Sequence, residues 1–122
     1  MANILVVDDI EDVREGIAAV LKSVGHSITE AKDGREAISK LGMGKFDLVI
    51  TDIMMPEQDG TEVIMYIESL NPRPPVLAIS GGAPNVPAYM ALHLARLKAD
   101  ATLMKPFRND ELRSKVDALL KI

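Results

Sequence analysis

The stretch "LVVDDIEDV" at residues 5–13 joins a short apolar run to a dense group of acidic side chains. Residues 4–7 have the length and the continuous apolar character of a buried strand. Asp8 and Asp9 follow directly, and Glu11 and one more acid lie within the next turn. Like charges this close repel, at a cost on the order of 4 kcal/mol for two charges about 4 Å apart at an effective dielectric of about 20. This repulsion indicates that a cation belongs among the acids.

The segment after these acids is predicted to be a helix, because apolar residues recur there at helical spacing until Gly25. A strand followed by a helix then recurs four more times. The predicted strands are residues 4–7, 27–31, 46–51, 75–80 and 101–104, and the predicted helices are residues 11–24, 34–43, 61–70, 86–98 and 110–121. Asp33 and Asn109 are expected to cap the second and the last helix. Gly42 and Gly44 are expected to end the second helix.

Alternation of strands and helices is typical of a parallel sheet with right-handed crossovers and helices on both faces. Near-continuous apolar strands belong in the centre of such a sheet, which places residues 4–7, 47–51 and 76–80 there. The strand at 27–31 alternates polar and apolar residues and the strand at 101–104 is short, so both are expected at edges. The predicted fold class is α/β: a flavodoxin-like, doubly wound (βα)5 parallel sheet of five strands in the order 2-1-3-4-5.

Polar residues stand at the carboxyl ends of four of these strands, where sheets of this kind place their sites. They are Asp8 and Asp9, then Asp52, then Ser80, then Lys105. Clustered carboxylates with no histidine or cysteine beside them suit Mg²⁺, Mn²⁺ or Ca²⁺. The lysine is a point charge suited to a phosphate, the serine hydroxyl can donate to a phosphoryl oxygen, and a carboxylate can itself act as the nucleophile. The sequence therefore predicts a metal-assisted aspartyl-phosphate site.

Composition excludes several classes of protein. The chain has 122 residues and no cysteine, so disulfides and thiolate metal sites are absent and a reducing cytoplasm is the expected location. The net charge is −4 and no dense basic block occurs, which argues against nucleic acid as the main partner. No apolar run approaches the roughly 18 residues of a membrane span, and the N-terminus lacks the pattern of a secretory signal.

Four motifs mark the strand ends: "VVDD" at 6–9, "TDIMMPEQDG" at 51–60, "AISGG" at 78–82 and "LMKPF" at 103–107. Together they resemble the receiver domain of two-component response regulators, of the single-domain chemotaxis-regulator kind. Each motif alone is weak, but each stands here at its expected strand end, and the resemblance covers the whole chain. It implies a Mg²⁺-dependent phosphoacceptor rather than an enzyme, one that receives its phosphoryl group from a sensor histidine kinase or a histidine phosphotransfer protein. It also implies that the chain supports its own phosphorylation and autodephosphorylation on Asp52.

The resemblance also assigns the metal ligands. It implies that Asp9 and Asp52 bind Mg²⁺ directly, that the backbone carbonyl of Met54 is a third ligand, and that Asp8 acts through a bound water. Mn²⁺ or Ca²⁺ is expected to substitute in binding.

The phosphoryl group has its own expected partners. The resemblance implies that Asp52 is the phosphoacceptor, that Ser80 hydrogen-bonds the phosphoryl group and that Lys105 pairs with it. It also implies a cis bond between Lys105 and Pro106, a bend that aims the lysine at the phosphate.

One position departs from the family pattern. Many receivers carry an aromatic residue three positions before the lysine, where this chain has Thr102. The largest response to phosphorylation is therefore expected in residues 81–98, and an unknown downstream protein is expected to dock on the face formed by residues 86–121. Residues 1–122 are expected to be a monomeric receiver without an output domain, although a fragment of a longer regulator or hybrid kinase stays open.

Other functions remain possible on the residues alone. A flavodoxin shares the sheet order, but the acidic loop after residue 7 would repel the flavin phosphate. A phosphatase of the haloacid dehalogenase type places its nucleophile and its acid two residues apart after the first strand, and this chain lacks such a pair. A receiver retained only for docking would not need the acids together with Ser80 and Lys105. Asp8 and Asp9 alone could also be a helix N-terminal pair favoured by the helix dipole.

Overall fold

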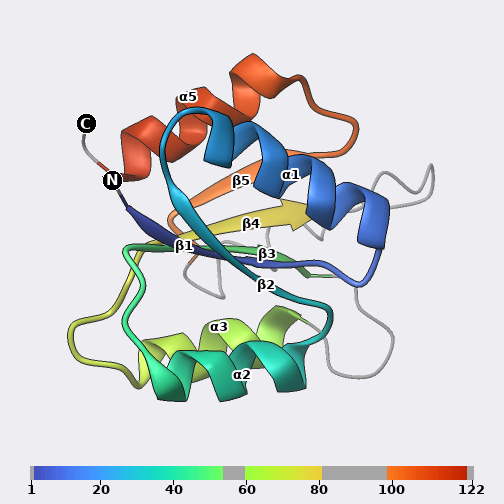
Figure 1. The fold of residues 1–122 in the computed structure, drawn as a ribbon. Helices are drawn as coiled ribbons and strands as arrows, with labels where there is room; N and C mark the ends of the chain where they lie inside the picture. Colours follow the sequence, from blue (N-terminus) through green and yellow to red (C-terminus); the bar gives the residue numbers. More distant parts are fainter. Residues whose placement is uncertain (1, 54–59, 81–98, 121–122) are drawn as a thin grey trace.

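The computed structural model describes residues 2–53, 60–80 and 99–120. It contains a parallel sheet of five strands in the order β2-β1-β3-β4-β5 (Figure 1), which confirms the predicted topology. The strands are β1 (Asn3–Val7), β2 (Ser27–Ala31), β3 (Leu48–Asp52), β4 (Val76–Ser80) and β5 (Ala101–Met104).

The described helices lie in two layers. They are α1 (Glu11–Ser23), α2 (Gly34–Met43), α3 (Gly60–Glu68) and α5 (Asn109–Leu120). Helices α1 and α5 cover one face of the sheet, and α2 and α3 cover the other (Figure 1). The helix predicted at residues 86–98 lies outside the described residues. Within the described residues, no helix has both the length and the apolar content that crossing a bilayer requires.

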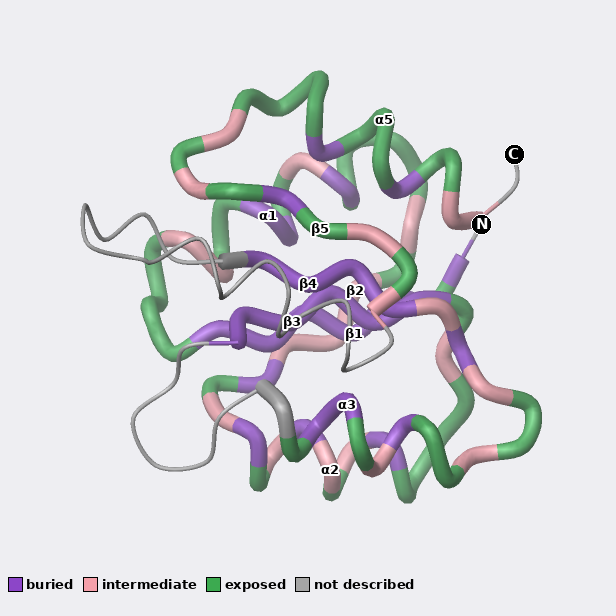
Figure 2. Tube along the Cα trace, turned by 180° about the vertical axis from the view of Figure 1, so that it is seen from behind, coloured by how far each residue is buried: buried purple, intermediate pink, exposed green. Residues whose placement is uncertain are grey.

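Each face of the sheet carries its own apolar core, because successive side chains of a strand point to opposite faces. In β1, Leu5 and Val7 belong to the core beneath α2 and α3, whereas Ile4 and Val6 belong to the core beneath α1 and α5. Buried residues run along the strands and along the sides of the helices that face them (Figure 2). Strand β3 is buried along its whole length, as expected for the centre of a doubly wound sheet.

The predicted start of the third strand was wrong. Strand β3 begins at Leu48 and not at residue 46, and it extends to Asp52. The Asp47 side chain instead accepts a 2.8 Å hydrogen bond from the backbone N–H of Asn3, which fixes the approach to the strand. Helix α2 spans Gly34–Met43 as predicted, with Gly42 inside its last turn and Gly44 as its C-cap.

Side-chain hydrogen bonds and a glycine define the ends of three helices. Asp33 caps α2 as predicted, because its side chain accepts a 2.8 Å hydrogen bond from the backbone N–H of Glu36. The predicted cap at Asn109 was wrong by one residue: the carbonyl of Arg108 accepts the first helical bond of α5, and Glu111 accepts from the Arg108 backbone N–H. After α1, Gly25 has a φ of 97°, a left-handed conformation that glycine adopts without a steric penalty.

The amino ends of β4 and β5 are tied together by one carboxylate. Asp100 Oδ2 accepts hydrogen bonds from Arg73 at 2.9 Å and from the backbone N–H of Val76 at 2.7 Å. Arg73 also pairs with Glu68 at 2.7 Å. This network lies at the opposite end of the strands from the acidic residues.

Candidate functional site

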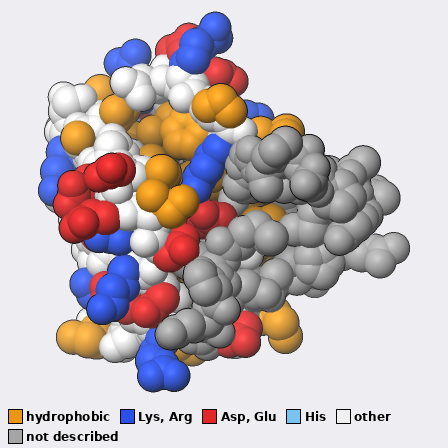
Figure 3. Space-filling model, turned by 90° about the vertical axis from the view of Figure 1, so that its right-hand side faces the viewer, with side chains coloured by type: hydrophobic (Ala, Val, Ile, Leu, Met, Phe, Trp, Pro, Cys, Tyr) orange, Lys and Arg blue, Asp and Glu red, His pale blue; other side chains and the backbone are white. Residues whose placement is uncertain are grey.

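Three acidic side chains meet where β1 and β3 end. Ligand oxygens of Asp8, Asp9 and Asp52 all lie within 4.8 Å of one another. Asp8 and Asp52 are 1% and 2% exposed, whereas Asp9 is exposed. The face at which the strands end shows acidic side chains gathered beside lysine and arginine (Figure 3). The predicted juxtaposition of these three aspartates is therefore present, with one carboxylate at the solvent side and two in the interior.

Lys105 brings a positive charge to two of these carboxylates. Its Nζ donates to Asp52 Oδ2 at 2.9 Å and to Asp8 Oδ2 at 3.0 Å, and its side chain is 14% exposed. Burial disfavours the ammonium and lowers the pKa of Lys105, but the hydrogen bonds and charges of Asp52 and Asp8 outweigh burial, so the pKa is raised above its usual value. The ammonium is thus firmly charged at neutral pH and offsets part of the carboxylate repulsion.

Asp8 has hydrogen-bond partners in several directions. Its backbone N–H donates to the carbonyl of Ala31 at 3.1 Å. Its Oδ1 accepts from the backbone N–H of Ile10 at 2.9 Å. Together with the bond from Lys105, these contacts fix the carboxylate between the end of β1 and the start of α1.

The donor set fits a divalent cation that prefers oxygen ligands. Three carboxylates converge, and the carboxylate of Asp9 is exposed to solvent. Hard cations such as Mg²⁺ bind through one or two carboxylates and retain several waters. Met54, the predicted carbonyl ligand, lies outside the described residues. Which of Asp8 and Asp9 contacts an ion directly stays a prediction.

The other predicted site residues have defined backbone positions. Ser80 ends β4 in register with Met104, which places its backbone beside the residue before Lys105. The Lys105–Pro106 bond is cis, as the resemblance implied. Thr102 is exposed on β5.

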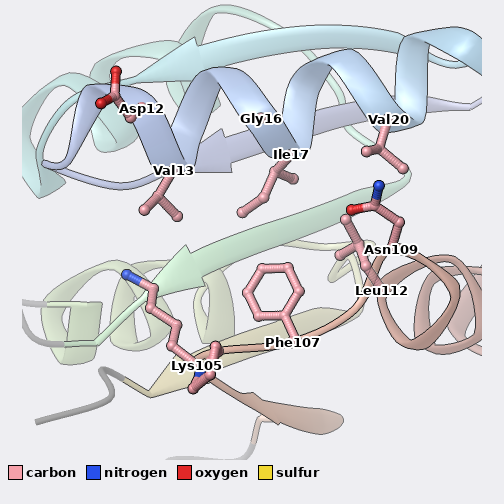
Figure 4. Close-up of a pocket in the computed structure, with 10 residues that line it drawn as sticks. Asp12, Val13, Gly16, Ile17, Val20, Lys105, Phe107, Asn109 and Leu112 are labelled. Atoms are coloured by element: carbon pink, nitrogen blue, oxygen red, sulfur yellow. The ribbon is translucent and has the colours of Figure 1, made fainter.

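A groove of about 610 Å³ runs beside Lys105 between α1 and the segment that leads into α5. Lys105 and Phe107 face Val13 and Ile17 across it (Figure 4). Phe107 also packs against the core beneath α1 and α5, as a packing residue does.

Sequence reasoning missed Arg14. Its guanidinium donates to the backbone carbonyl of Asp8 at 3.0 Å through Nη1 and to Glu30 Oε1 at 3.1 Å through Nε. The arginine stands in the first half of α1, at a half-buried position one turn beyond the acidic loop. An arginine within the predicted helix was the only signal, and it does not reveal which way the side chain reaches.

Comparison with known proteins places this site in a family. The chain is 36% identical over 118 residues to "Response regulator MprA" of Mycolicibacterium vanbaalenii, covering 97% of this chain and 50% of that protein. It is 34% identical over 119 residues to "Response regulator RR06" of Streptococcus pneumoniae, covering 98% and 53%. The chain therefore spans about half the length of these curated relatives.

Solved structures give the same result. The chemotaxis protein CheY4 of Vibrio cholerae superposes with a TM-score of 0.86 at 27% identity, covering 98% of both chains. The receiver domain of the Francisella response regulator 1452 superposes with a TM-score of 0.87 at 28% identity, covering 99% and 98%. The sequence model of the family described as "Response regulator receiver domain" matches residues 4–117, which include the three aspartates and Lys105. The chain therefore belongs to the family of response regulator receiver domains.

Proposed function

We propose that Asp52 accepts a phosphoryl group and that the resulting charge changes which proteins bind this chain. The observation that carries the proposal is the contact of Lys105 with both Asp52 and Asp8, 2.9 and 3.0 Å from Nζ, at the end of a buried central strand. A carboxylate fixed by a buried cation keeps its nucleophilic oxygens charged and oriented. Positioning and charge neutralisation are what phosphoryl transfer chiefly requires.

Receiver domains of this family bind Mg²⁺. In this chain we propose that Asp9 and Asp52 hold the ion with the carbonyl of Met54, and that Asp8 contributes through water. The bound ion would neutralise charge that develops on the phosphoryl oxygens. Asp52 Oδ would form the new O–P bond while the donor's bond to phosphorus breaks, and Lys105 and Ser80 would stabilise the transferred group.

Response regulators interact with sensor kinases. We propose that the phosphodonor is a phosphohistidine of such a kinase or of a phosphotransfer protein. The N–P bond breaks, its electron pair stays on the imidazole nitrogen, and the O–P bond forms on Asp52. Hydrolysis of the aspartyl phosphate by water would reset the chain, so the domain is a switch rather than an enzyme with an external substrate.

Phosphorylation adds roughly −1.5 to −2 charges at neutral pH. The response proposed for residues 81–98 falls on a segment outside the described residues. A downstream protein would bind the face formed by residues 86–121, of which β5 and α5 are described. We propose that the receiver acts as a monomer in the cytoplasm.

Labelling with acetyl phosphate and Mg²⁺ tests the assignment of Asp52. One phosphoryl group should be added, and its linkage should be stable in acid and labile to base and hydroxylamine. Asp52→Asn should abolish labelling. Asp117→Asn, at an exposed position of α5, is the matched control and should label like the wild type. Equal labelling of the Asp52→Asn variant would refute the proposal.

A further inference from the structure

We infer that Arg14 is a positioning residue for the metal site: it fixes the peptide between Asp8 and Asp9 and thereby sets the affinity for a divalent cation. This inference rests on the proposed binding of Mg²⁺ by the three aspartates. Arg14 would not itself contact the ion or the phosphoryl group.

Arg14 contacts the backbone of the acidic loop directly. Arg14 Nη1 donates to the Asp8 carbonyl at 3.0 Å. That carbonyl and the N–H of Asp9 belong to one rigid peptide plane. A hydrogen bond that holds the carbonyl therefore also orients the plane from which Asp9 begins. Because Asp9 is exposed, packing contributes little to its placement, and the orientation of its backbone matters correspondingly more.

Arg14 is also anchored on the side away from the acidic loop, by Glu30. Its Nε donates to Glu30 Oε1 at 3.1 Å, and the two side chains are 14% and 32% exposed. Glu30 lies on the edge strand β2, in register with Val6 of β1. Lys40 of α2 in turn donates to the Glu30 carbonyl at 3.0 Å. The guanidinium thus bridges the edge of the sheet to the acidic loop, which a shorter or single-donor side chain cannot do at both ends.

The charge of Arg14 is balanced by Glu30. A lone guanidinium this near to the aspartates would repel an incoming divalent cation. The carboxylate of Glu30 neutralises Arg14, so the clamp supplies geometry without lowering affinity by repulsion. Lys105 differs, because its ammonium pairs with the same carboxylates that would bind the ion.

The alternative is that Arg14 merely stabilises the fold, and a second arginine provides the control. Arg73 donates to Glu68 at 2.7 Å and to Asp100 at 2.9 Å, with a side chain 25% exposed. It therefore also bridges two acids in a partly buried setting, but at the far end of the strands. Arg14→Met and Arg73→Met should both lower the free energy of unfolding, whereas only Arg14→Met should weaken metal binding.

The test is titration of the intact chain with MgCl₂ by calorimetry, together with urea unfolding in the presence of a chelator. Removing partners that orient metal ligands typically weakens binding about 10- to 100-fold, and we expect the Kd of Arg14→Met to rise within that range. Arg14→Lys, which keeps the charge but has a single donor nitrogen, should recover part of the affinity. The Kd of Arg73→Met should match that of the wild type.

Failure of this inference differs from failure of the proposed function. A wild-type chain that shows no Mg²⁺ binding would overturn the proposed metal site itself. A wild type that binds while Arg14→Met binds equally well, or equal weakening in both arginine variants, would overturn only the role of Arg14.

If Arg14→Met does not fold, the Glu30→Gln variant tests the same inference. Glu30→Gln leaves the contact with Asp8 in place but removes the charge that neutralises Arg14. Its Kd for Mg²⁺ should rise at low ionic strength and return toward the wild-type value as salt screens the repulsion. A Kd equal to that of the wild type at low salt would contradict the inference.

Discussion

Lys105 and Asp52, separated by 53 positions in the chain, are joined by a hydrogen bond of 2.9 Å between Nζ and Oδ2. The bond connects the end of the central strand β3 to the residue after the edge strand β5. The two side chains are largely buried, at 14% and 3% exposure. Substituting either residue should therefore change both the stability of the fold and the properties of the site.

Lys105→Met should destabilise the chain most when no divalent cation is present. Removing one partner of a buried ion pair leaves the remaining charges uncompensated, at a cost of about 3–5 kcal/mol. Saturating Mg²⁺ should restore part of the loss, because the ion would replace the missing positive charge. Chemical unfolding with and without Mg²⁺ measures both values. Arg73→Met is the control, since its loss should not depend on Mg²⁺. An identical loss for Lys105→Met in both conditions would contradict the expectation.

The same pair predicts a pH dependence. The pKa of Lys105 is raised in the folded chain above the usual 10.5. A raised folded-state pKa means that the stabilising contribution is complete below the unfolded-state pKa and is lost as pH rises through the folded-state pKa. The difference in unfolding free energy between wild type and Lys105→Met should therefore be constant at neutral pH and shrink only in strong alkali. Unfolding measured from about pH 8 to about pH 12 tests this. A difference that already shrinks below about pH 9 would be inconsistent with it.

Asp9→Asn should weaken Mg²⁺ binding more than Asp8→Asn. Both oxygens of Asp8 already accept hydrogen bonds, from Ile10 and Lys105, whereas Asp9 stands at the exposed side of the cluster. We expect the Kd of Asp9→Asn to rise by about tenfold or more, which corresponds to about 1.4 kcal/mol. Titration calorimetry of the two variants gives the comparison, and equal losses would count against the assigned roles.

Two glycines of the first strand–helix unit should respond to alanine in opposite directions. Gly25 has a φ of 97°, so Gly25→Ala should lower the free energy of unfolding by about 1 kcal/mol or more. Gly16 lies within α1, and a Cβ there would meet no atom within 4 Å. Gly16→Ala should therefore raise the free energy of unfolding by up to about 1 kcal/mol. Urea unfolding of both variants is the measurement, and the same sign for both would contradict the backbone argument.

The fold was predictable because buried positions are occupied by apolar residues, and their pattern is visible in the sequence. The continuous apolar runs at the centre and the alternating strand at 27–31 determine the strand order, and the order brings Asp8, Asp52 and Lys105 to one rim. The start of β3 was missed because the Asp47 side chain accepts the hydrogen bond of the Asn3 N–H. The cap of α5 was missed because the Glu111 side chain accepts from the Arg108 N–H, which has no partner within the helix. The contact of Arg14 was missed for a different reason, since the direction of a long side chain depends on its rotamer and on neighbours from other elements.

The carboxylate of Asp100, which accepts from Arg73 and from the Val76 N–H, has a practical consequence. It secures the strands at the end away from the aspartates, so a reporter group attached near that end is separated from the chemistry by the length of the sheet. Asn71 is exposed in the connection that precedes β4. A cysteine introduced there would be the sole thiol in the chain, which offers a position for a fluorescent label at the end of the sheet away from Asp52.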